Sequence, residues 1–382
     1  MAKRKTIFYI WKSAYPWDVR VEKICMALLE ANYDVYIVCK WEGEELEEEI
    51  VNGLNILRVG YKESSQKYSP FPFNPFWKKS IESLIQKHKP DLLINREIIL
   101  AEISGKLAKK YNIPIVMDMA ENYPAAMKNW KKYNDSFLKR FIFNTLEIAY
   151  KLESFCLKLM TGVLVVCTEN KNRLIYNYKF NKDNIKIIYN TPSIKSFNFK
   201  RDEVDREFKT IAYHGYINNE RNLEIFLDVA KDFSDLNFDI WGKITSESTI
   251  KEDFNIYSNI NFYGEYDLNS LKEIIKDTDI GVLPYKIDEH INNTISNKLF
   301  DYMANGIPVI TSKAIPMTTL IDEYHNGVYY DFSDRNGIRK CLSELNKYDW
   351  QQLGKNGRKA FLQEFNWEND KKKLIEFIGA LI

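Results

Sequence analysis

Short, mostly apolar runs alternate along this chain with stretches whose apolar residues recur at helical spacing. In the first half the apolar runs are residues 7–11, 35–39, 91–95, 113–119, 162–167 and 185–189. Strands that are apolar on both faces and separated by helices are typical of a parallel sheet that helices cover on both sides. The alternation therefore predicts an α/β fold built on a doubly wound parallel sheet.

The alternation stops once, at a polar stretch near residues 190–208, and then begins again. The second set of strand-like runs is 210–217, 237–242, 259–264, 280–285 and 307–312. A chain of 382 residues is too long for one ordinary hydrophobic core. We therefore predict two Rossmann-like domains, the first at 1–192, with a linker near 192–208. Ligands of such sheets bind at the carboxyl ends of the strands, so we expect one in the cleft between the domains.

The overall charge and the cysteines narrow the class of protein. The formal net charge is +1 at pH 7, which does not favour a nucleic-acid binder. The cysteines are scattered and form no CxxC pair, which indicates buried free thiols in a reducing compartment. They are Cys25, Cys39, Cys156, Cys167 and Cys341. The run at 7–11 is too short for a signal peptide, and no run approaches the ~18 apolar residues that span a bilayer. We therefore expect a cytoplasmic protein.

The segment SNKLFDYMANGIPVI, residues 296–310, carries the most informative polar side chains. The pattern predicts a helix that begins near Asn293–Ser296 and ends at 305–306, before a strand. Lys298 falls in the first turns, where a cation opposes the helix dipole unless a phosphate lies nearby. Asp301 lies one turn further and could accept hydrogen bonds from ribose hydroxyls. An ordinary helix whose lysine and aspartate face solvent explains the spacing equally well.

This segment resembles the donor-binding segment of retaining glycosyltransferases of family 4. In that family two acidic residues lie seven residues apart; the second binds the nucleotide ribose and the first contacts the donor sugar. Asp301 matches the second acid, and Asn293 stands at the position of the first. The resemblance implies a GT-B fold, with two Rossmann-like domains facing across a cleft. It also implies a donor domain at 193–364 and a C-terminal helix at 365–382 that packs back on the first domain.

Residues 214–227 resemble the strand, loop and helix that bind the donor diphosphate in this family. Arg221 falls at the position of the family's lysine, and Tyr216 stands where the family has an arginine. Arg221 could instead pair with a neighbouring glutamate on a helix surface. His214 precedes this loop, where a lone histidine is more often structural. The donor-binding residues that we predict are Gly215, Tyr216, Arg221, Lys243, Gly264, Tyr266, Asn293, Ser296, Asn297, Lys298, Leu299 and Asp301.

The first domain resembles the acceptor-binding half of the same enzymes. Residues 117–124 match a segment that contains Asp-x-His-Glu in the family, with Ala120 in place of the histidine. The resemblance implies front-face attack in which the departing diphosphate takes the acceptor proton, so the protein supplies position and charge. We predict catalytic roles for Glu121, Asp118 and Glu97 and acceptor-binding roles for Asp18, Arg20 and Arg96. A cap of a helix or turn is the alternative for Asp118.

Metals and cofactors are not expected. The sequence contains no HxxxH motif and no carboxylate cluster that demands a metal, and GT-B enzymes generally need none. The nucleotide-diphosphate sugar is a co-substrate, so we predict no cofactor.

Residues 126–160 contain seven Lys or Arg against three Asp or Glu, with aromatic residues interleaved. A basic amphipathic helix with aromatics can lie on an anionic membrane surface. The alternative is a helix packed on the sheet with a basic solvent face. The membrane interpretation would place the protein peripherally on the inner face of the cytoplasmic membrane.

Taken together, the sequence predicts a retaining glycosyltransferase that uses a nucleotide-diphosphate sugar. We favour UDP because it is the commonest donor base. The expected acceptor is a saccharide or lipid-linked saccharide in surface polysaccharide, lipopolysaccharide or glycan assembly. A sugar-nucleotide epimerase of the same fold and a non-catalytic nucleotide-sugar binding protein are the alternatives.

Overall fold

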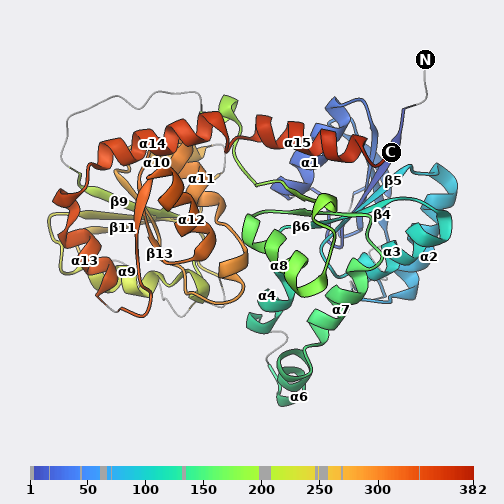
Figure 1. Ribbon diagram of the computed structural model, residues 1–382, viewed down its shortest axis with the longest axis horizontal. Helices are drawn as coiled ribbons and strands as arrows, with labels where there is room; N and C mark the ends of the chain where they lie inside the picture. Colours follow the sequence, from blue (N-terminus) through green and yellow to red (C-terminus); the bar gives the residue numbers. More distant parts are fainter. Residues whose placement is uncertain are drawn as a thin grey trace. The chain divides into compact units, whose positions relative to one another are not determined.

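The computed structural model describes residues 4–16, 18–43, 45–60, 67–69, 71–130, 135–197, 208–245, 248, 257–267, 270–334 and 336–382 (Figure 1). The chain forms two compact units. The first unit is Met1–Tyr189 together with Asp370–Ile382, and the second is Asn190–Asn369. Most of the linker predicted near 192–208 lies outside the described residues.

The first unit is built on an eight-stranded sheet in the order β3-β4-β2-β1-β5-β6-β7-β8. Its strands are β1 (Thr6–Ile10), β2 (Asp34–Lys40), β3 (Glu48–Val51), β4 (Leu54–Val59), β5 (Leu92–Arg96), β6 (Ile115–Met119), β7 (Gly162–Val165) and β8 (Ile185–Ile187). β3 pairs antiparallel with β4, and the other pairs are parallel. The strand order reverses between β1 and β5, so the loops that follow these two strands diverge at their carboxyl ends.

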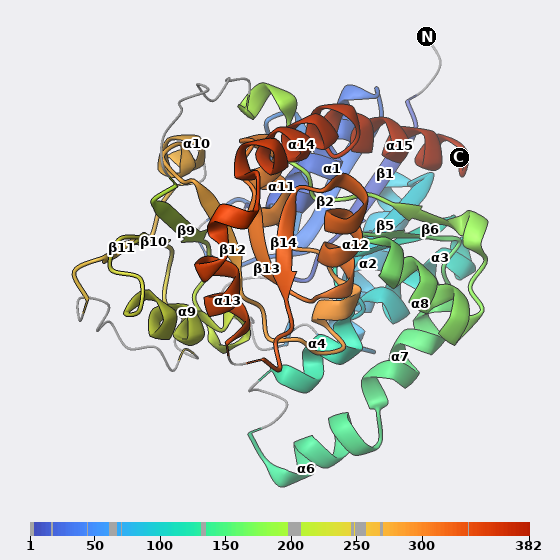
Figure 2. The same cartoon turned by 60° about the vertical axis from the view of Figure 1, so that its left-hand side comes forward.

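Helices cover this sheet on both faces (Figures 1 and 2). They are α1 (Val19–Glu30), α2 (Pro75–His88), α3 (Ala101–Tyr111), α4 (Tyr123–Asn129), α7 (Ile148–Leu157) and α8 (Thr168–Tyr178), with a 3-10 turn η3 at Lys182–Asn184. The helix α6 (Phe137–Arg140) and a π-helical turn η2 (Phe141–Thr145) extend away from the sheet (Figure 1). Phe8 and Ile10 of β1 lie in one apolar cluster with Trp77 and Ile81 of α2. Every residue of β1 is buried, which is why the strand is apolar throughout.

The second unit contains a six-stranded, all-parallel sheet in the order β11-β10-β9-β12-β13-β14. Its strands are β9 (Thr210–His214), β10 (Asn237–Trp241), β11 (Ile260–Gly264), β12 (Ile280–Leu283), β13 (Val309–Ser312) and β14 (Gly327–Tyr330). This is the strand order of a dinucleotide-binding fold, and it reverses between β9 and β12. The carboxyl ends of these two strands are therefore where a ligand is expected.

The helices of the second unit surround the sheet, and α12 and α14 lie beside β14 (Figure 2). They are α9 (Leu223–Ala230), α10 (Leu271–Ile275), α11 (Asn297–Ala304), α12 (Ile315–Tyr324), α13 (Gly337–Ser343) and α14 (Trp350–Gln363), with 3-10 turns η4 (Ile194–Phe197), η5 (Asn219–Arg221), η8 (Ile291–Asn293) and η9 (Leu345–Lys347).

The C-terminal helix α15 (Trp367–Gly379) packs on the first unit, as predicted. Lys371 of α15 forms an ion pair with Glu30 of α1. The ring of Phe377 lies against Gly162 of β7, where a Cβ would approach it to 2.8 Å. The five cysteines are free and buried, which also agrees with the prediction.

Some local predictions were wrong or incomplete. The strands β3, β4 and β14 were not predicted, and the residues of the edge strand β3 alternate between exposed and half-buried. The basic stretch 126–160 is not one helix, because α4 ends at Asn129 and α7 begins only at Ile148, after Glu147 adopts φ 50°. Residues 131–134 of that stretch lie outside the described residues. The helix predicted to begin near Asn293–Ser296 and to end at 305–306 is confirmed, because α11 begins at Asn297, directly after Ser296, and ends at Ala304.

Candidate functional site

The candidate donor site lies at the carboxyl ends of β9 and β12. His214 ends β9 and is followed by Gly215 with φ +116°, a conformation that L side chains rarely adopt. A Cβ at Gly215 would lie 2.2 Å from Cε of Lys298. The Lys298 side chain therefore runs directly past this glycine. The absence of a side chain at position 215 allows a cation from the start of α11 to reach the end of β9.

Tyr285 follows β12 and connects the polar groups of this site. Its side chain is 1% exposed, and its hydroxyl lies 2.6 Å from the hydroxyl of Ser296. Its ring is 4.7 Å from the guanidinium carbon of Arg221. A backbone hydrogen bond of 3.0 Å from Lys286 N to Glu220 O keeps the two loops together. Tyr285 thus joins a residue from the β9 loop with the start of α11.

The charges in this cluster change the pKa values of Tyr285 and Lys298. Burial would raise the pKa of Tyr285, but the nearby Lys298 and Arg221 cations outweigh it and hold the pKa below its usual value. Burial lowers the pKa of Lys298, and the charge of Arg221 lowers it further against the opposing effect of Tyr285 and Asp301. Two cations held this close favour the binding of an anion.

Asp301 lies one turn into α11, where it meets the buried His214. Nε2 of His214 is 3.3 Å from Oδ2 of Asp301. The imidazole also packs edge-on against the rings of Tyr302 and Tyr266, at 4.9 and 6.4 Å between centroids. Burial lowers the pKa of His214, so the neutral imidazole donates to the carboxylate at neutral pH. The contact fixes the orientation of Asp301.

The remaining donor-site predictions differ in how they fit this cluster. Lys243 forms an exposed ion pair with Glu265 at 3.2 Å, so its charge is already compensated there. Asn293 donates from its side chain to the Glu289 carbonyl at 2.8 Å. Leu299 is buried in the core, while Asn297 and Tyr216 are exposed. Gly264 ends β11 with φ +76° and precedes Tyr266.

Two residues of the cluster were not predicted as donor-binding residues. Tyr285 is the last residue of an apolar run at 280–285, so the rule that ligands bind at carboxyl ends of central strands could have identified it. His214 was recognised but interpreted as structural. Its partner Asp301 is 87 positions away, and no local pattern reveals that contact.

The candidate acceptor site is centred on Asp118, which is fully buried at the end of β6. Its carboxylate accepts hydrogen bonds from Arg20 at 2.7 Å, from Tyr9 at 2.6 Å and from Arg96 at 3.2 Å. Burial would raise the pKa of Asp118, but Arg20 and Arg96 outweigh it and hold the pKa below its usual value. Both carboxylate oxygens are engaged, which fits an anchor for the two arginines better than a proton acceptor.

Asp18 completes this network at the amino end of α1. It caps the helix by accepting from the backbone N–H groups of Arg20 and Val21, each at 2.9 Å. Its other oxygen is 3.3 Å from Arg96. Arg20 donates to the Ile188 carbonyl at 2.9 Å. The three residues predicted to bind the acceptor thus share one network with Asp118.

Glu97 and Glu121 lie near this network, and the backbone N–H of Glu97 donates to the Asp118 backbone carbonyl at 3.1 Å. Glu97 follows β5 with φ 66° and forms an ion pair with Lys12 at 2.5 Å. Glu121 is half-buried. After burial, the charge of Glu97 and then that of Glu121 help to raise the pKa of Tyr123. Both carboxylates therefore lie close enough to the buried Tyr123 to act on its hydroxyl.

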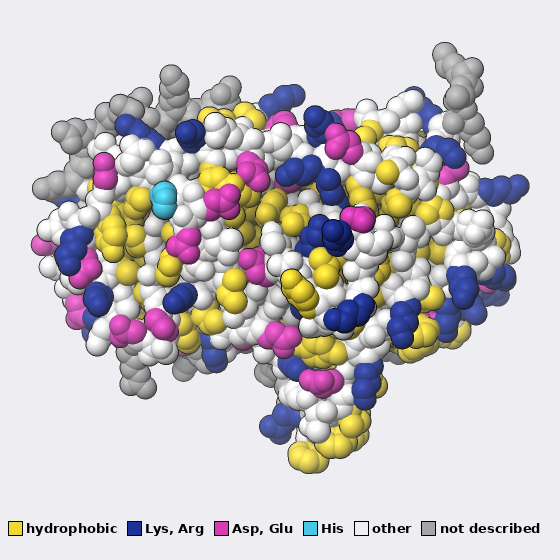
Figure 3. All heavy atoms as spheres, in the orientation of Figure 1, with side chains coloured by type: hydrophobic (Ala, Val, Ile, Leu, Met, Phe, Trp, Pro, Cys, Tyr) yellow, Lys and Arg dark blue, Asp and Glu magenta, His cyan; other side chains and the backbone are white. Residues whose placement is uncertain are grey.

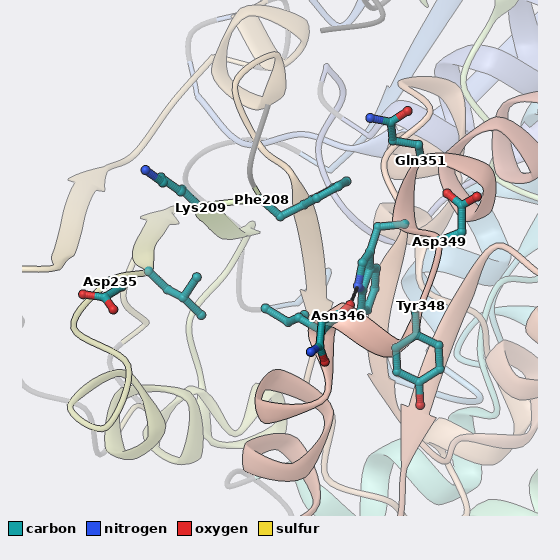
Figure 4. A pocket seen from close by; sticks show the side chains of 10 residues that line it. Phe208, Lys209, Asp235, Asn346, Tyr348, Asp349 and Gln351 are labelled. Atoms are coloured by element: carbon teal, nitrogen blue, oxygen red, sulfur yellow. Dashed lines mark hydrogen bonds between the residues drawn. The ribbon is translucent and has the colours of Figure 1, made fainter. Parts of the chain in front are cut away.

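A separate cavity of about 480 Å³ opens at the opposite edge of the second sheet (Figure 4). Phe208, Lys209 and Leu236, which line it, precede β9 and β10. Trp350, at the start of α14, forms another wall. This cavity is at the amino ends of the strands and contains none of the predicted site residues.

The described part of the chain offers neither a metal-binding cluster nor a membrane-spanning helix. No group of three or more His, Cys, Asp or Glu side chains there is placed to hold a metal ion. Among the same residues no helix is both long and apolar enough to cross a bilayer.

Two α/β units with mainly parallel sheets, and a C-terminal helix that packs on the first unit, define the GT-B class of glycosyltransferases. Residues 18–191 match the family described as Glycosyltransferase Family 4, and residues 208–347 match the family described as Glycosyl transferases group 1. The two matches together cover most of both units, and the chain belongs to the glycosyltransferases of group 1 and family 4. Its enzymes transfer sugars with retention and without a metal ion, so the predicted family, fold and enzyme class are confirmed.

Solved structures show the same fold. Sucrose-phosphate synthase from Thermosynechococcus elongatus has a TM-score of 0.75 at 15% identity, covering 99% of both chains. The lipopolysaccharide outer core galactosyltransferase WaaB has 0.68 at 13% identity, covering 99% of this chain and 100% of its own. Anabaena Alr3699/HepE in complex with UDP-glucose has 0.68 at 12% identity, covering 98% and 99%. The comparison with curated proteins gave no match.

Proposed function

We propose that the chain moves a sugar, with retention, from a nucleotide-diphosphate sugar to a saccharide or lipid-linked saccharide acceptor. The observation that carries this proposal is the convergence of Arg221, Lys298 and Asp301 at the carboxyl ends of β9 and β12. The second unit holds the donor in this proposal, and the first unit binds the acceptor.

The cations and the carboxylate fit different parts of a sugar nucleotide. Arg221 and Lys298 bind the diphosphate, since a guanidinium and an ammonium are the usual phosphate ligands. Asp301, oriented by His214, accepts hydrogen bonds from the ribose. Gly264 and Tyr266 border the base, and Asn293 contacts the sugar. UDP is the favoured nucleotide, which the UDP-glucose complex of the similar HepE fold supports.

The chemistry follows from where negative charge develops. As the glycosidic bond to the diphosphate breaks, charge grows on the leaving phosphate, where Arg221 and Lys298 stabilise it. The departing phosphate takes the proton of the attacking acceptor hydroxyl. Glu121 and Glu97 orient the acceptor, and Asp118 holds Arg20 and Arg96 in position. This assigns Asp118 a positioning role instead of the catalytic role predicted from the sequence.

A lipid-linked acceptor is supported by an apolar surface on the first unit. The α6 and η2 segment extends away from the sheet, and hydrophobic side chains gather over α6 (Figures 1 and 3). Phe137 is 80% exposed and Leu138 65%. Other exposed apolar side chains of this segment and of α7 are Phe141, Leu146, Ile148 and Phe155. So large an exposed apolar group marks an interaction surface.

A second aromatic group joins this surface through a lysine. Phe71, Phe73 and Phe76 are exposed at the start of α2. The ammonium of Lys106 lies 5.5 Å from the ring of Phe73 and 5.6 Å from that of Phe155. Exposed aromatics alternating with cations fit the headgroup region of an anionic membrane. This membrane interpretation concerns the surface formed by α6, η2, α7 and the start of α2, and not the single amphipathic helix that the sequence predicted.

The proposal is tested by a thermal-shift screen of the purified protein against UDP-, GDP-, ADP-, dTDP- and CMP-sugars, with and without chelator. A ligand that binds the native state raises the midpoint. A shift with one base that is unchanged by chelator, followed by sugar transfer to an acceptor, supports it. Consumption of the donor as an isomer without an acceptor favours the epimerase, and binding without any turnover favours the non-catalytic alternative.

A further inference from the structure

Tyr285 is buried and contacts both the loop that follows β9 and the start of α11. It lies two residues beyond the end of β12, at the point where the strand order of the second sheet reverses. The β9 loop brings Arg221 over its ring, and the start of α11 brings Ser296 to its hydroxyl. Lys298 interacts with the same hydroxyl.

The contact with Ser296 alters the amino end of α11. Ser296 is the residue before the helix, where a serine normally accepts a hydrogen bond from a backbone N–H of the first turn. Its side chain makes no such bond here. Its hydroxyl lies instead 2.6 Å from that of Tyr285. The first N–H groups of α11 are thus left without a side-chain cap, next to the Lys298 ammonium.

The ring of Tyr285 fixes the second cation. The Arg221 guanidinium lies 4.7 Å from the ring centroid, a favourable position for a cation on an aromatic face. Asn218 accepts from the backbone N–H of Arg221 at 3.2 Å and so holds the turn that carries it. Like charges on Arg221 and Lys298 oppose one another, and a bound anion removes that repulsion.

We propose that Tyr285 is a positioning residue for the donor diphosphate. Its ring holds Arg221, and its hydroxyl draws Ser296 away from the helix, so that two cations and the uncapped start of α11 face the same phosphates. This inference rests on the proposed donor site and adds to it a role for Tyr285. It predicts that Tyr285 affects binding of the diphosphate and leaves recognition of the nucleoside unchanged.

The variants separate the two contacts. Tyr285→Phe keeps the ring and removes the hydroxyl, so Ser296 becomes free to cap α11. Tyr285→Leu removes both contacts. In the double variant Tyr285→Phe with Ser296→Ala, residue 296 has no hydroxyl with which to cap the helix. Tyr324→Phe, which removes an exposed hydroxyl that bonds Glu364, is the matched control.

Calorimetric titrations with inorganic pyrophosphate, UDP and uridine measure the effect. We expect Tyr285→Phe to weaken pyrophosphate and UDP about fivefold, as the loss of one hydrogen bond would, and to leave uridine and the thermal midpoint unchanged. Adding Ser296→Ala should restore part of the lost affinity, a rescue that a purely structural role would not give. Tyr285→Leu should weaken UDP further.

Two results overturn the inference. One is a Tyr285→Phe variant that binds UDP and pyrophosphate as tightly as the wild type. The other is an equal loss for uridine, or the absence of rescue in the double variant. Failure of the wild type to bind any nucleoside diphosphate, tested with UDP, ADP and GDP, would contradict the proposed function itself.

Discussion

The imidazole of His214 lies 3.3 Å from the carboxylate of Asp301, at the point where β9 ends and the second turn of α11 passes. His214 is 1% exposed, and its ring makes edge-on contacts with the rings of Tyr302 and Tyr266. One residue from a strand end and one from a helix are thereby fixed to each other. The orientation of the proposed ribose ligand depends on this buried contact.

The burial of His214 predicts a specific pH dependence of stability. Its pKa is lowered below 6.5, mainly by burial, so the unfolded state binds more protons than the folded state just below pH 6.5. The free energy of unfolding should therefore fall as the pH falls through this window, by at most about 1.4 kcal/mol per pH unit for this group. Urea unfolding of the wild type and of His214→Asn measures it. The variant should lose this part of the slope, whereas the exposed His325→Asn should keep it.

Gly215→Ala should separate backbone strain from loss of the donor site. A Cβ there would require φ +116° and would displace Lys298. Gly306→Ala is the control, because it needs φ +66° but would meet no atom closer than 3.7 Å. Both variants should lose about 1–2 kcal/mol of stability, and only Gly215→Ala should weaken nucleotide binding, by more than about tenfold. Equal nucleotide affinities for the two variants would show that Lys298 does not need this glycine.

Asp118→Asn should strongly destabilise the first unit. The amide keeps the shape of the carboxylate but leaves Arg20 and Arg96 without its charge in a buried position. Removing one partner of a buried ion pair costs about 3–5 kcal/mol. Chemical denaturation should show this loss, while Glu48→Gln, which breaks an exposed pair with Lys87, should change stability little. A small effect of Asp118→Asn would argue against its role as the anchor.

The surface around α6 predicts binding to anionic vesicles. Replacing Phe137 and Leu138 together with serine should weaken binding to phosphatidylglycerol-containing vesicles at least about tenfold, since burial of two such side chains contributes about 3 kcal/mol or more. Tyr176→Ser, at an exposed aromatic of α8, is the control and should bind as the wild type does. Cosedimentation measures the bound fraction. A wild type that does not cosediment removes the membrane from the proposal.

The sequence was sufficient for the features that depend on local periodicity. Apolar runs predicted most strands of both sheets, because central parallel strands are buried on both faces. β3 and β14 were missed because they are edge strands, which need no apolar pattern. β4 was missed because Asn55 and Arg58 interrupt its apolar residues. The break in 126–160 was missed because helical spacing continues on both sides of Glu147, whose φ is 50°.

The candidate site was likewise predictable only where sequence spacing identifies its residues. Arg221, Lys298 and Asp301 were found because the family motifs fix their spacing in the sequence. For other predicted residues, the partners that decide their roles were not predictable. Lys243 forms an ion pair with Glu265, and Asp118 accepts hydrogen bonds from Arg20, which is 98 positions away in the sequence. Such contacts depend on side-chain rotamers and on strand order, which local sequence does not encode.

The most direct test of the central claim is calorimetric titration with UDP, UMP and uridine of the wild type, of Asp301→Ala and of Arg221→Gln with Lys298→Met. Asp228→Ala, at an exposed aspartate of α9, is the control. We predict that the wild type binds UDP, that the double variant loses the preference for UDP over uridine, and that Asp301→Ala weakens all three ligands. A double variant that retains the wild-type preference for UDP would contradict the placement of the donor diphosphate at Arg221 and Lys298.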